Sequence, residues 1–326
     1  MYMSFDQFIL KEQYKKVQGL GDRLVLMKNE IDWKPFIPLV KSVYYDDDKI
    51  GGRPHTDELI IIRSMLLQSW YGLSDPELEF ACNDRLSFRN FLDFADKVPD
   101  FTTIWKARER LKQKGVDVLI WAELQAQLDK KGFKVKEGVI QDASFIEADL
   151  GKKRYYHEKK AKKNDEVIEY TDKQKRHQDS DATFSIKLNQ VHFGYKSHLK
   201  IDRDFQLIRA YETSTASLHD GQVDLANDDE VVYRDRGYTG KSTKAKGNAS
   251  MKRGKLSFAE KSRNKRISKK RVMGERPFGV IKNVFNGERT RVKTLARVDI
   301  KEMFKNMAFN LYQLVTLTRK ALARAI

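Results

Sequence analysis

Cysteine is almost absent from this chain of 326 residues, which contains Cys82 alone. An internal disulfide and a cysteine-based metal cluster are therefore excluded, and a reducing compartment is favoured. Long apolar runs are missing too, because stretches such as Leu59–Ile62 and Met65–Leu67 fall far short of the roughly 20 residues that span a membrane. The opening residues, MYMSFDQFIL, lack the basic segment and cleavage pattern of a signal peptide. We therefore expect a cytoplasmic protein with no membrane partner.

Basic charge dominates what is present. The chain has 63 Lys and Arg residues against 46 Asp and Glu residues, a formal net charge of +17. The excess is concentrated in Lys241–Lys293, where 18 basic residues face three acidic ones, a net charge of +15 in 53 residues. Self-repulsion destabilises such a block unless a polyanion neutralises it. Nucleic acid is the favoured partner. An anionic membrane surface is the alternative, but no lipid anchor or amphipathic membrane helix accompanies the block.

The front of the chain has the pattern of short capped helices. Hydrophobic residues make up 40% of the chain, enough for a sizeable core, and the length suggests two domains. Asp57 is placed to cap a helix, Ser74 and Glu77 form a capping box for a second, and Thr102 or Thr103 caps a third. The exposed side of the third helix would carry Lys106, Arg108, Arg110 and Lys112. These features fit a helix-turn-helix-like module over residues 1–132, although the pattern alone favours a plain helical bundle with a solvated basic face.

After residue 132 the period changes from helical to extended. Short β-branched or alternating runs predict strands at Gly138–Phe145, Val191–Ile201 and Glu230–Gly240. Residues 152–176 are highly charged and read as an exposed loop, and Asp299 with Glu302 would cap a final amphipathic helix. The expected fold is α/β (α+β), a mixed sheet flanked by helices over residues 133–326, preceded by the all-helical domain.

Three acidic residues stand out by their context. Asp142 and Asp235 each end a predicted strand, and Glu275 lies where a helix is expected to begin, with Gly274 near its cap. Strand ends converge at one edge of a sheet, and hard cations such as Mg²⁺ take carboxylate oxygens as ligands. Two such ions, roughly 4 Å apart, can cut a phosphodiester. Arg271 and Lys282 flank Glu275, and an ordinary salt-bridged helix face remains an equal interpretation of these two.

The same residues resemble a known family. Asp142 in QDAS, Asp235 in YRDRGYTG and the spacing Arg271–x3–Glu275–x6–Lys282 resemble the DDE transposases of bacterial and archaeal insertion sequences, closest to the group around insertion sequence five, which is related to insertion sequence four. The stretch GGRPHTDELIIIRSMLLQSWYGL resembles the N-terminal transposase domain of that group, and MFKNMAFNLYQL resembles its terminal helix. One departure is Ser268, where the four-type pattern has Tyr.

The resemblance implies a site and a set of partners. Asp142, Asp235 and Glu275 would be the catalytic, metal-binding residues of an RNase H-like domain using two Mg²⁺ ions, with Mn²⁺ as a substitute. DNA would be bound by a further set of residues: Arg271 and Lys282 at the phosphates of the element's end, Tyr238 beside the strand, and Arg266, Lys269 and Lys270 in the basic segment 241–293. The partners would be double-stranded DNA, as terminal inverted repeats and target, and a second copy in a homodimer. The protein would then be associated with the nucleoid.

The leading hypothesis is therefore a transposase that cleaves DNA at the ends of its element and transfers the strands. A nuclease of the same fold without strand transfer and a non-catalytic DNA-binding regulator are the alternatives. The helical front would recognise the element ends and the α/β part would perform the chemistry. His192 and His198 share a strand face by their even spacing, but a metal site there needs a third ligand, and packing is the favoured explanation.

Overall fold

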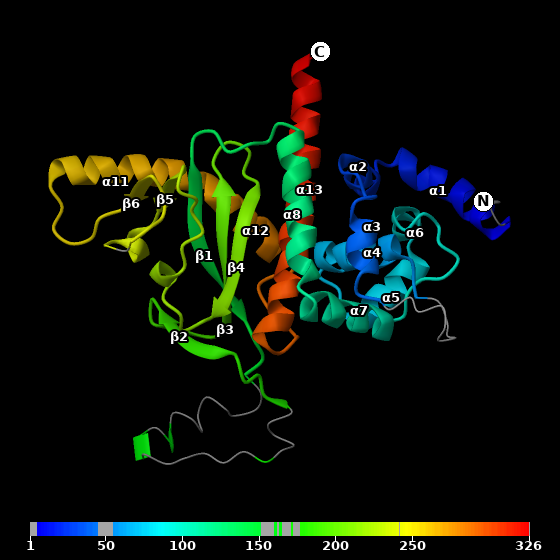
Figure 1. Ribbon diagram of the computed structural model, residues 1–326, viewed down its shortest axis with the longest axis horizontal. Coiled ribbons are helices and arrows are strands. Elements are labelled where there is room, and N and C mark those ends of the chain that lie inside the picture. Colours follow the sequence, from blue (N-terminus) through cyan, green and yellow to red (C-terminus); the bar gives the residue numbers. More distant parts are fainter. Residues whose placement is uncertain are drawn as a thin grey trace. The chain divides into compact units, whose positions relative to one another are not determined.

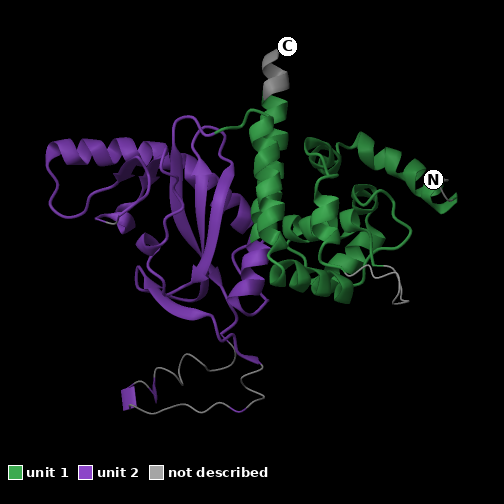
Figure 2. Cartoon of the chain, in the orientation of Figure 1, with its two compact units in different colours: residues 1–134, 303–326 green, residues 135–302 purple. Residues whose placement is uncertain are grey.

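The chain divides into two compact units, which Figure 2 shows in different colours. The computed structural model describes residues 5–44, 55–150, 160–161, 163–164, 171, 177–240 and 242–325, with side chains as far as residue 320. The first unit comprises residues 1–134 and 303–326, and the second comprises residues 135–302. The break after residue 134 lies close to the boundary expected after residue 132. Residues 303–326, however, group with the helical front and not with the α/β part.

All the regular secondary structure in the described residues of the first unit is helical (Figure 1). Its helices are α1 (Phe5–Gly19), α2 (Arg23–Glu30), α3 (Phe36–Lys41), α4 (Glu58–Tyr71), α5 (Asp75–Asp84), α6 (Leu86–Phe91), α7 (Phe101–Gln113) and α8 (Val116–Lys130). The caps predicted for α4 and α5 are confirmed, because the Asp57 side chain accepts from the first turn and Ser74 with Glu77 forms the capping box. For α7 the prediction is wrong by two or three residues. Asp100 is the cap and accepts from the Thr103 amide.

Helix α4 is the centre of this unit. Every residue from Ile61 to Trp70 is buried, including the polar Arg63, Ser64 and Gln68. A helix that is covered on all sides needs neighbours around it, and α3, α5 and α7 all pack against α4. The run of apolar residues therefore marks the core of the unit and leaves the basic side chains of α7 at its periphery, with one exception.

That exception is Arg108, which was expected on the exposed side of α7 and is instead 2% exposed. Its guanidinium donates to both carboxylate oxygens of Asp75, at 3.0 and 2.7 Å, and to Gln68 Oε1 at 2.9 Å. The fork of Arg matches a carboxylate in this two-bond manner, which explains why a charged side chain is tolerated in the core. Arg108 therefore ties α7 to α4 and α5.

Replacing Arg108 with Ala is expected to destabilise the first unit by about 3–5 kcal/mol, because it leaves Asp75 partly buried without its counterion. Urea unfolding followed by circular dichroism measures the loss. The matched control is Arg110→Ala, since Arg110 is an exposed cation of the same helix. An Arg108→Ala variant as stable as Arg110→Ala would show that the buried ion pair contributes nothing.

The second unit contains a mixed sheet of six strands among the described residues. They are β1 (Val139–Glu147), β2 (Thr183–Lys187), β3 (Gln190–Asp202), β4 (Ile208–Thr215), β5 (Val231–Arg234) and β6 (Gly247–Ser250). The order is β2-β3-β1-β5-β6, and β4 also pairs with β3, beyond the end of β2. β3 is antiparallel to β1, β2 and β4, whereas β5 is parallel to β1 and β6 is parallel to β5. This arrangement confirms the expected RNase H-like sheet.

The long helices of this unit in the described residues are α11 (Phe258–Arg271), α12 (Glu275–Asn283) and the first part of α13 (Leu295–Ala325), which continues into the first unit. The expected cap of α13 is wrong, because the helix begins at Leu295 and Asp299 lies inside it. Its first amides are capped from a distant segment instead. Thr294 N donates to Asp179 Oδ1 at 3.1 Å and Leu295 N donates to Asp181 Oδ2 at 2.8 Å.

Two further expectations concern membrane-spanning helices and the charged residues 152–176. None of the helices in the described residues combines the length and the apolar character needed to cross a membrane. Most of residues 152–176, expected as an exposed loop, lie outside the part of the chain that the structure describes.

His198 on β3 is fully buried, and its Nε2 lies 2.8 Å from Ser214 Oγ. Burial lowers the pKa of this imidazole to about 4, with the Lys196 charge acting in the same direction and Asp220 opposing it. A depressed pKa means that the neutral ring stabilises the fold fully above pH 6.5 and that this stability is lost as the pH falls towards 4. The loss is about 3 kcal/mol at most.

The expected result is a fall in the free energy of unfolding of the second unit between pH 6.5 and pH 4. Denaturant titrations at a series of pH values measure it. His198→Gln retains a polar side chain without the titration, so its stability should vary less over the same window. An equally steep pH dependence in His198→Gln would assign the effect to other groups.

Candidate active site

Asp142 and Asp235 are brought side by side by the pairing of β1 with β5, and Asp235 directly follows β5, but the prediction that Asp142 ends its strand is wrong, because β1 continues to Glu147. The parallel register joins Val139 to Val232 and Ile140 to Tyr233. Asp142 lies two residues after Ile140, and Asp235 lies two residues after Tyr233. Because the two segments run parallel, the two aspartates lie opposite each other. Neighbouring strands lie about 5 Å apart, which places the two residues close together just beyond the point where the pairing of β1 with β5 ends. The structure thus brings together two of the three predicted acids.

The close approach of β1 to β5 begins at Gly138, immediately before β1. Its φ is +108°, and a Cβ added there would lie 2.5 Å from the carbonyl oxygen of Val231. Any side chain would therefore force the start of β1 away from β5. Glycine at position 138 is a local requirement for the register that aligns Asp142 with Asp235.

Asp142 lies in an unfavourable electrostatic environment. Burial raises the pKa of its carboxyl group, the Asp235 charge raises it further, and Arg271 and the Ala143 amide partly counter this. Arg271 forms an ion pair with Asp142 Oδ2, and the Ala143 amide donates to Oδ1 at 2.9 Å. The net effect is a raised pKa, so this site favours a cation close to the carboxylate.

Asp235 is held by the short 3-10 turn that follows β5. Its Oδ1 accepts from the Gly237 amide at 2.6 Å, which fixes the orientation of the carboxylate. Both aspartates offer the hard oxygen ligands that Mg²⁺ and Mn²⁺ prefer, and a divalent cation would offset the repulsion between them. The donor chemistry of this pair therefore fits the metal that the sequence predicts.

Glu275 begins α12, as predicted, and Gly274 precedes it as the cap. A Cβ on Gly274 would lie 2.7 Å from Ile140 Cγ2, so the absence of a side chain lets the start of α12 pack closely on β1. The Glu275 side chain itself is exposed. Within the described part of the chain, no group of three or more His, Cys, Asp or Glu side chains is arranged to hold a metal ion. The third predicted acid thus lies beside β1 without completing a three-carboxylate cluster.

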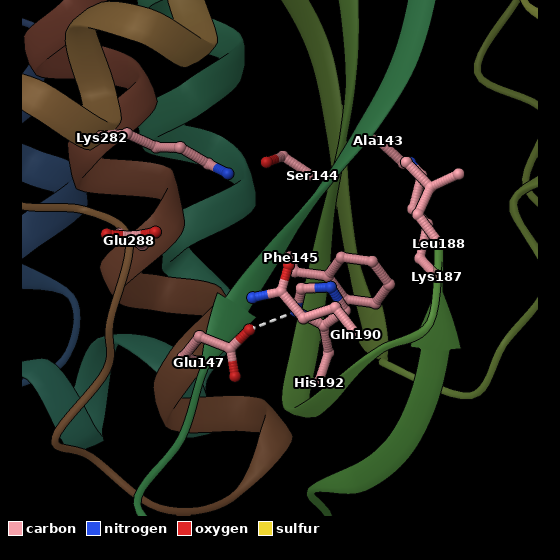
Figure 3. Close-up of a pocket in the computed structure, with 10 residues that line it drawn as sticks. All are labelled: Ala143, Ser144, Phe145, Glu147, Lys187, Leu188, Gln190, His192, Lys282 and Glu288. Carbon is pink, nitrogen blue, oxygen red and sulfur yellow. Dashed lines mark hydrogen bonds and ion pairs between the residues drawn. The ribbon is translucent and has the colours of Figure 1, made fainter.

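Lys282 lines a cavity of about 240 Å³ that adjoins β1 beyond Asp142. Figure 3 shows its amine directed towards Ser144, with Glu288 on the neighbouring loop. On the other side of the cavity, His192 stacks on Phe145 with ring centroids 4.0 Å apart. Its Nδ1 lies 2.5 Å from Glu147 Oε1. Arg271 is the last residue of α11 and pairs with Asp142, whereas Lys282 belongs to α12 and lines this cavity. The two residues therefore do not form a common salt-bridged helix face, which was the alternative interpretation.

Sequence reasoning missed Glu147 and Phe145, the partners of His192. The alternation of β1 places both on one face, which is the signal that could have found them. His192 and His198 do not act together. His198 pairs with Ser214, and the expectation of packing over metal binding agrees with their separate partners.

Tyr238 lies in the interior, with 1% of its surface exposed, and the Arg234 guanidinium lies 5.2 Å from the centre of its ring. Burial raises the pKa of its hydroxyl, as do the Asp220, Asp142 and Asp235 charges. Its Oη has no hydrogen-bond partner among the described residues. Tyr238 was expected beside a DNA strand, and the structure instead buries it, with the charges of both aspartates acting on its hydroxyl.

Helix α11 presents the basic surface that the charge pattern predicted. It carries seven basic residues and one acid, Glu260, which is used in the capping box with Ser257 and pairs with Lys252. The exposed cations are Lys261, Lys265, Arg266, Lys269 and Lys270. Lys270 also donates to Tyr233 Oη at 3.0 Å. Since the last residue of the helix is Arg271, this surface leads directly to Asp142.

Comparison with known proteins identifies the family of the chain. Residues 11–110 match a family described as a transposase domain, and residues 172–311 match a family described as a transposase DDE domain. The second match includes Asp235, Glu275 and α11, while Asp142 lies upstream of it. No solved structure matches the chain. The two matches cover most of the sequence, and the chain belongs to the DDE transposases of the insertion-sequence type.

Proposed function

We propose that this transposase cleaves DNA at the ends of its element and joins the freed strands to a target, in a reaction that depends on divalent metal ions. The observation that carries the proposal is the alignment of Asp142 with Asp235 by the parallel pairing of β1 with β5. That alignment supports a shared metal site, and the basic α11 reaches Asp142 through the ion pair of Arg271. Two Mg²⁺ ions, or Mn²⁺ in their place, are the proposed cofactors.

Asp142 and Asp235 would hold the ions, with Glu275 as the third ligand once DNA is bound. When bound, such ions supply a more acidic water or 3′-hydroxyl and neutralise charge on the leaving oxygen. The residues of the chain orient the substrate. Arg271 would transfer from Asp142 to a phosphate oxygen of the cut strand, and Lys282 would bind the strand beyond it. In cleavage, water would form a bond to the phosphorus at the end of the element as the P–O3′ bond breaks, which leaves a 3′-hydroxyl on the element and a 5′-phosphate on the flank. In joining, that 3′-hydroxyl would attack a target phosphorus, form a new P–O bond and release a 3′-hydroxyl of the target strand.

The helical unit is the proposed reader of the element ends. Helix α7 exposes Lys106 and Arg110 on one side while Arg108 is held in the core. An exposed basic helix on a rigid bundle is a suitable shape for the major groove. Because residues 303–326 group with this unit, the test uses the full chain. Lys106→Ala should lower affinity for element ends more than affinity for random duplex.

The test of the reaction uses linear DNA that contains both ends of the element. Cleavage is expected with Mg²⁺ or Mn²⁺ and none with EDTA, and joined products should appear when target DNA is added. Cleavage without joined products would identify a nuclease of the same fold. Tight, end-specific binding with no metal-dependent cleavage would identify a DNA-binding regulator. Sedimentation of the DNA complex tests the proposed homodimer.

A further inference from the structure

A side-chain bond continues the pairing of β1 with β5 at the point where the backbone ladder stops. The ladder joins residues 139 and 140 to residues 232 and 233. At the next level stand Gln141 and Arg234, and at the level after that stand the two aspartates. Arg234 Nη2 donates to Gln141 Oε1 at 2.6 Å, which links the two chains one residue before Asp142 and Asp235.

Both members of this link are wholly buried, Gln141 at 0% and Arg234 at 1% exposure. Gln141 uses its remaining groups as well, since its Nε2 donates to the Val223 carbonyl at 2.7 Å and its Oε1 also accepts from the Leu225 amide at 3.2 Å. Burying an arginine is strongly unfavourable unless its charge is paired and hydrogen-bonded, and Nη2 of Arg234 supplies both kinds of contact, to Asp224 and to Gln141.

The counterion of Arg234 is Asp224, on the segment that leads from β4 to β5. Asp224 also accepts from the Ala226 amide at 3.1 Å and from the Lys244 amide at 2.7 Å. The guanidinium of Arg234, a residue of β5, therefore contacts β1 through Gln141. Through Asp224 it is also linked to the segment before β5, at Ala226, and to the segment after β5, at Lys244. Because side chains alternate along a strand, Gln141 and Arg234 lie on the sheet face opposite to their neighbours Asp142 and Asp235.

We propose that Gln141 and Arg234 are positioning residues, which hold the carboxylates of Asp142 and Asp235 at the separation that divalent ions require. This inference rests on the proposed metal-dependent function of those two aspartates. Only two residue pairs of backbone ladder align β1 with β5, and the aspartates lie beyond them. Without the link, repulsion between the two carboxylates would favour a wider separation and a weaker site.

The geometry of the guanidinium makes the proposal testable. Arg234 bonds both Gln141 and Asp224 through Nη2, whose two N–H groups have fixed directions in the guanidinium plane, whereas a lysine amine is a point charge on a flexible stem. Arg234→Lys therefore retains the buried positive charge and removes the simultaneous link. Gln141→Met is the second variant. It keeps the length of the side chain, leaves the Arg234 pair with Asp224 and removes the bond between the strands.

The experiment measures the Mn²⁺ concentration at half-maximal cleavage of end-containing DNA, and Mn²⁺ binding to the same full-length protein–DNA complex by electron paramagnetic resonance. Loss of a residue that orients metal ligands typically weakens metal affinity about 10–100-fold. Both midpoints are expected to rise by about that factor in Arg234→Lys and in Gln141→Met. Saturating Mn²⁺ should restore much of the cleavage rate.

Tyr195→Phe is the matched control, because it removes a buried hydrogen bond of the same sheet, to Asp179 Oδ1 at 2.7 Å, away from β5. It should lower the melting temperature and leave both Mn²⁺ midpoints unchanged. If either folded variant keeps the wild-type midpoints, or changes them only as much as the control does, the positioning role is wrong while the proposed function stands. Wild-type protein that neither cleaves nor binds Mn²⁺ would overturn the proposed function, and this inference with it.

Discussion

Asp142→Asn and Asp235→Asn are each expected to reduce DNA cleavage by about 10³-fold or more, since groups that act as one unit in a site fail together when any one is lost. The amide keeps the size of the side chain but loses the negative charge and one acceptor oxygen. Affinity for DNA should be retained, because the exposed cations of α11 are untouched. Gel analysis of cleavage products together with a binding isotherm measures both quantities.

The matched control is Asp229→Asn, an exposed carboxylate of the same unit just before β5. It should cleave at the wild-type rate. Glu275→Gln separates two arrangements of the site. A loss as large as that of the aspartate variants would identify Glu275 as the third ligand in the DNA complex, whereas full activity would leave the ions to the aspartate pair. Wild-type cleavage by Asp142→Asn or Asp235→Asn would refute the site itself.

Features set by neighbouring residues were predictable from the sequence. The cap by Asp57 and the capping box of Ser74 with Glu77 depend on side chains two or three residues from the amides they bind. The same holds for the start of α12 at Glu275, which follows from Gly274 and from Pro277 in the first turn. Local chemistry alone decides these boundaries, so no knowledge of the fold is needed.

Features set by distant partners were not predictable in the same way. Arg108 has the same local pattern as its exposed neighbours, and only Asp75, 33 residues earlier, explains its burial. The start of α13 likewise depends on Asp179 and Asp181, more than 110 residues before it. The pattern around Asp299 and Glu302 resembles a helix start, but the distant carboxylates cap the helix earlier.

In the candidate site, too, some features were predictable from the sequence and others depend on distant partners. The rule that parallel strands end at one edge of a sheet predicted that Asp142 and Asp235 would lie close together, but the parallel register aligns them while Asp142 lies inside β1 and not at its end. The ion pair of Arg271 with Asp142 was not predictable, because it joins residues 129 apart in sequence. Nor does any local signal show that the Glu275 side chain is exposed, since a first-turn position fixes the backbone and not the direction of the side chain.

Removing charge from the exposed face of α11 is expected to weaken DNA binding and to flatten its dependence on salt. Each phosphate contact releases counterions and contributes about 0.9 to the slope of log affinity against log salt concentration. If six to ten phosphates are bound, wild-type affinity should fall by roughly 10³–10⁵ between 50 and 200 mM salt. The double variant Arg266→Gln/Lys269→Gln should lose about two units of slope and about 10–100-fold in affinity at 0.1 M salt.

Fluorescence anisotropy with labelled duplex over a series of salt concentrations gives both the slope and the affinity. Lys15→Gln is the control, because this exposed amine on α1 is already paired with Glu12 at 2.6 Å and its loss should leave the slope unchanged. Ser257 and Glu260 cap α11 independently of the substituted residues, so the double variant should keep the helix and differ from wild type in charge alone. A slope equal to that of the wild type would mean that the basic face of α11 is a solvated surface, and that the phosphates are held by other cations of the chain.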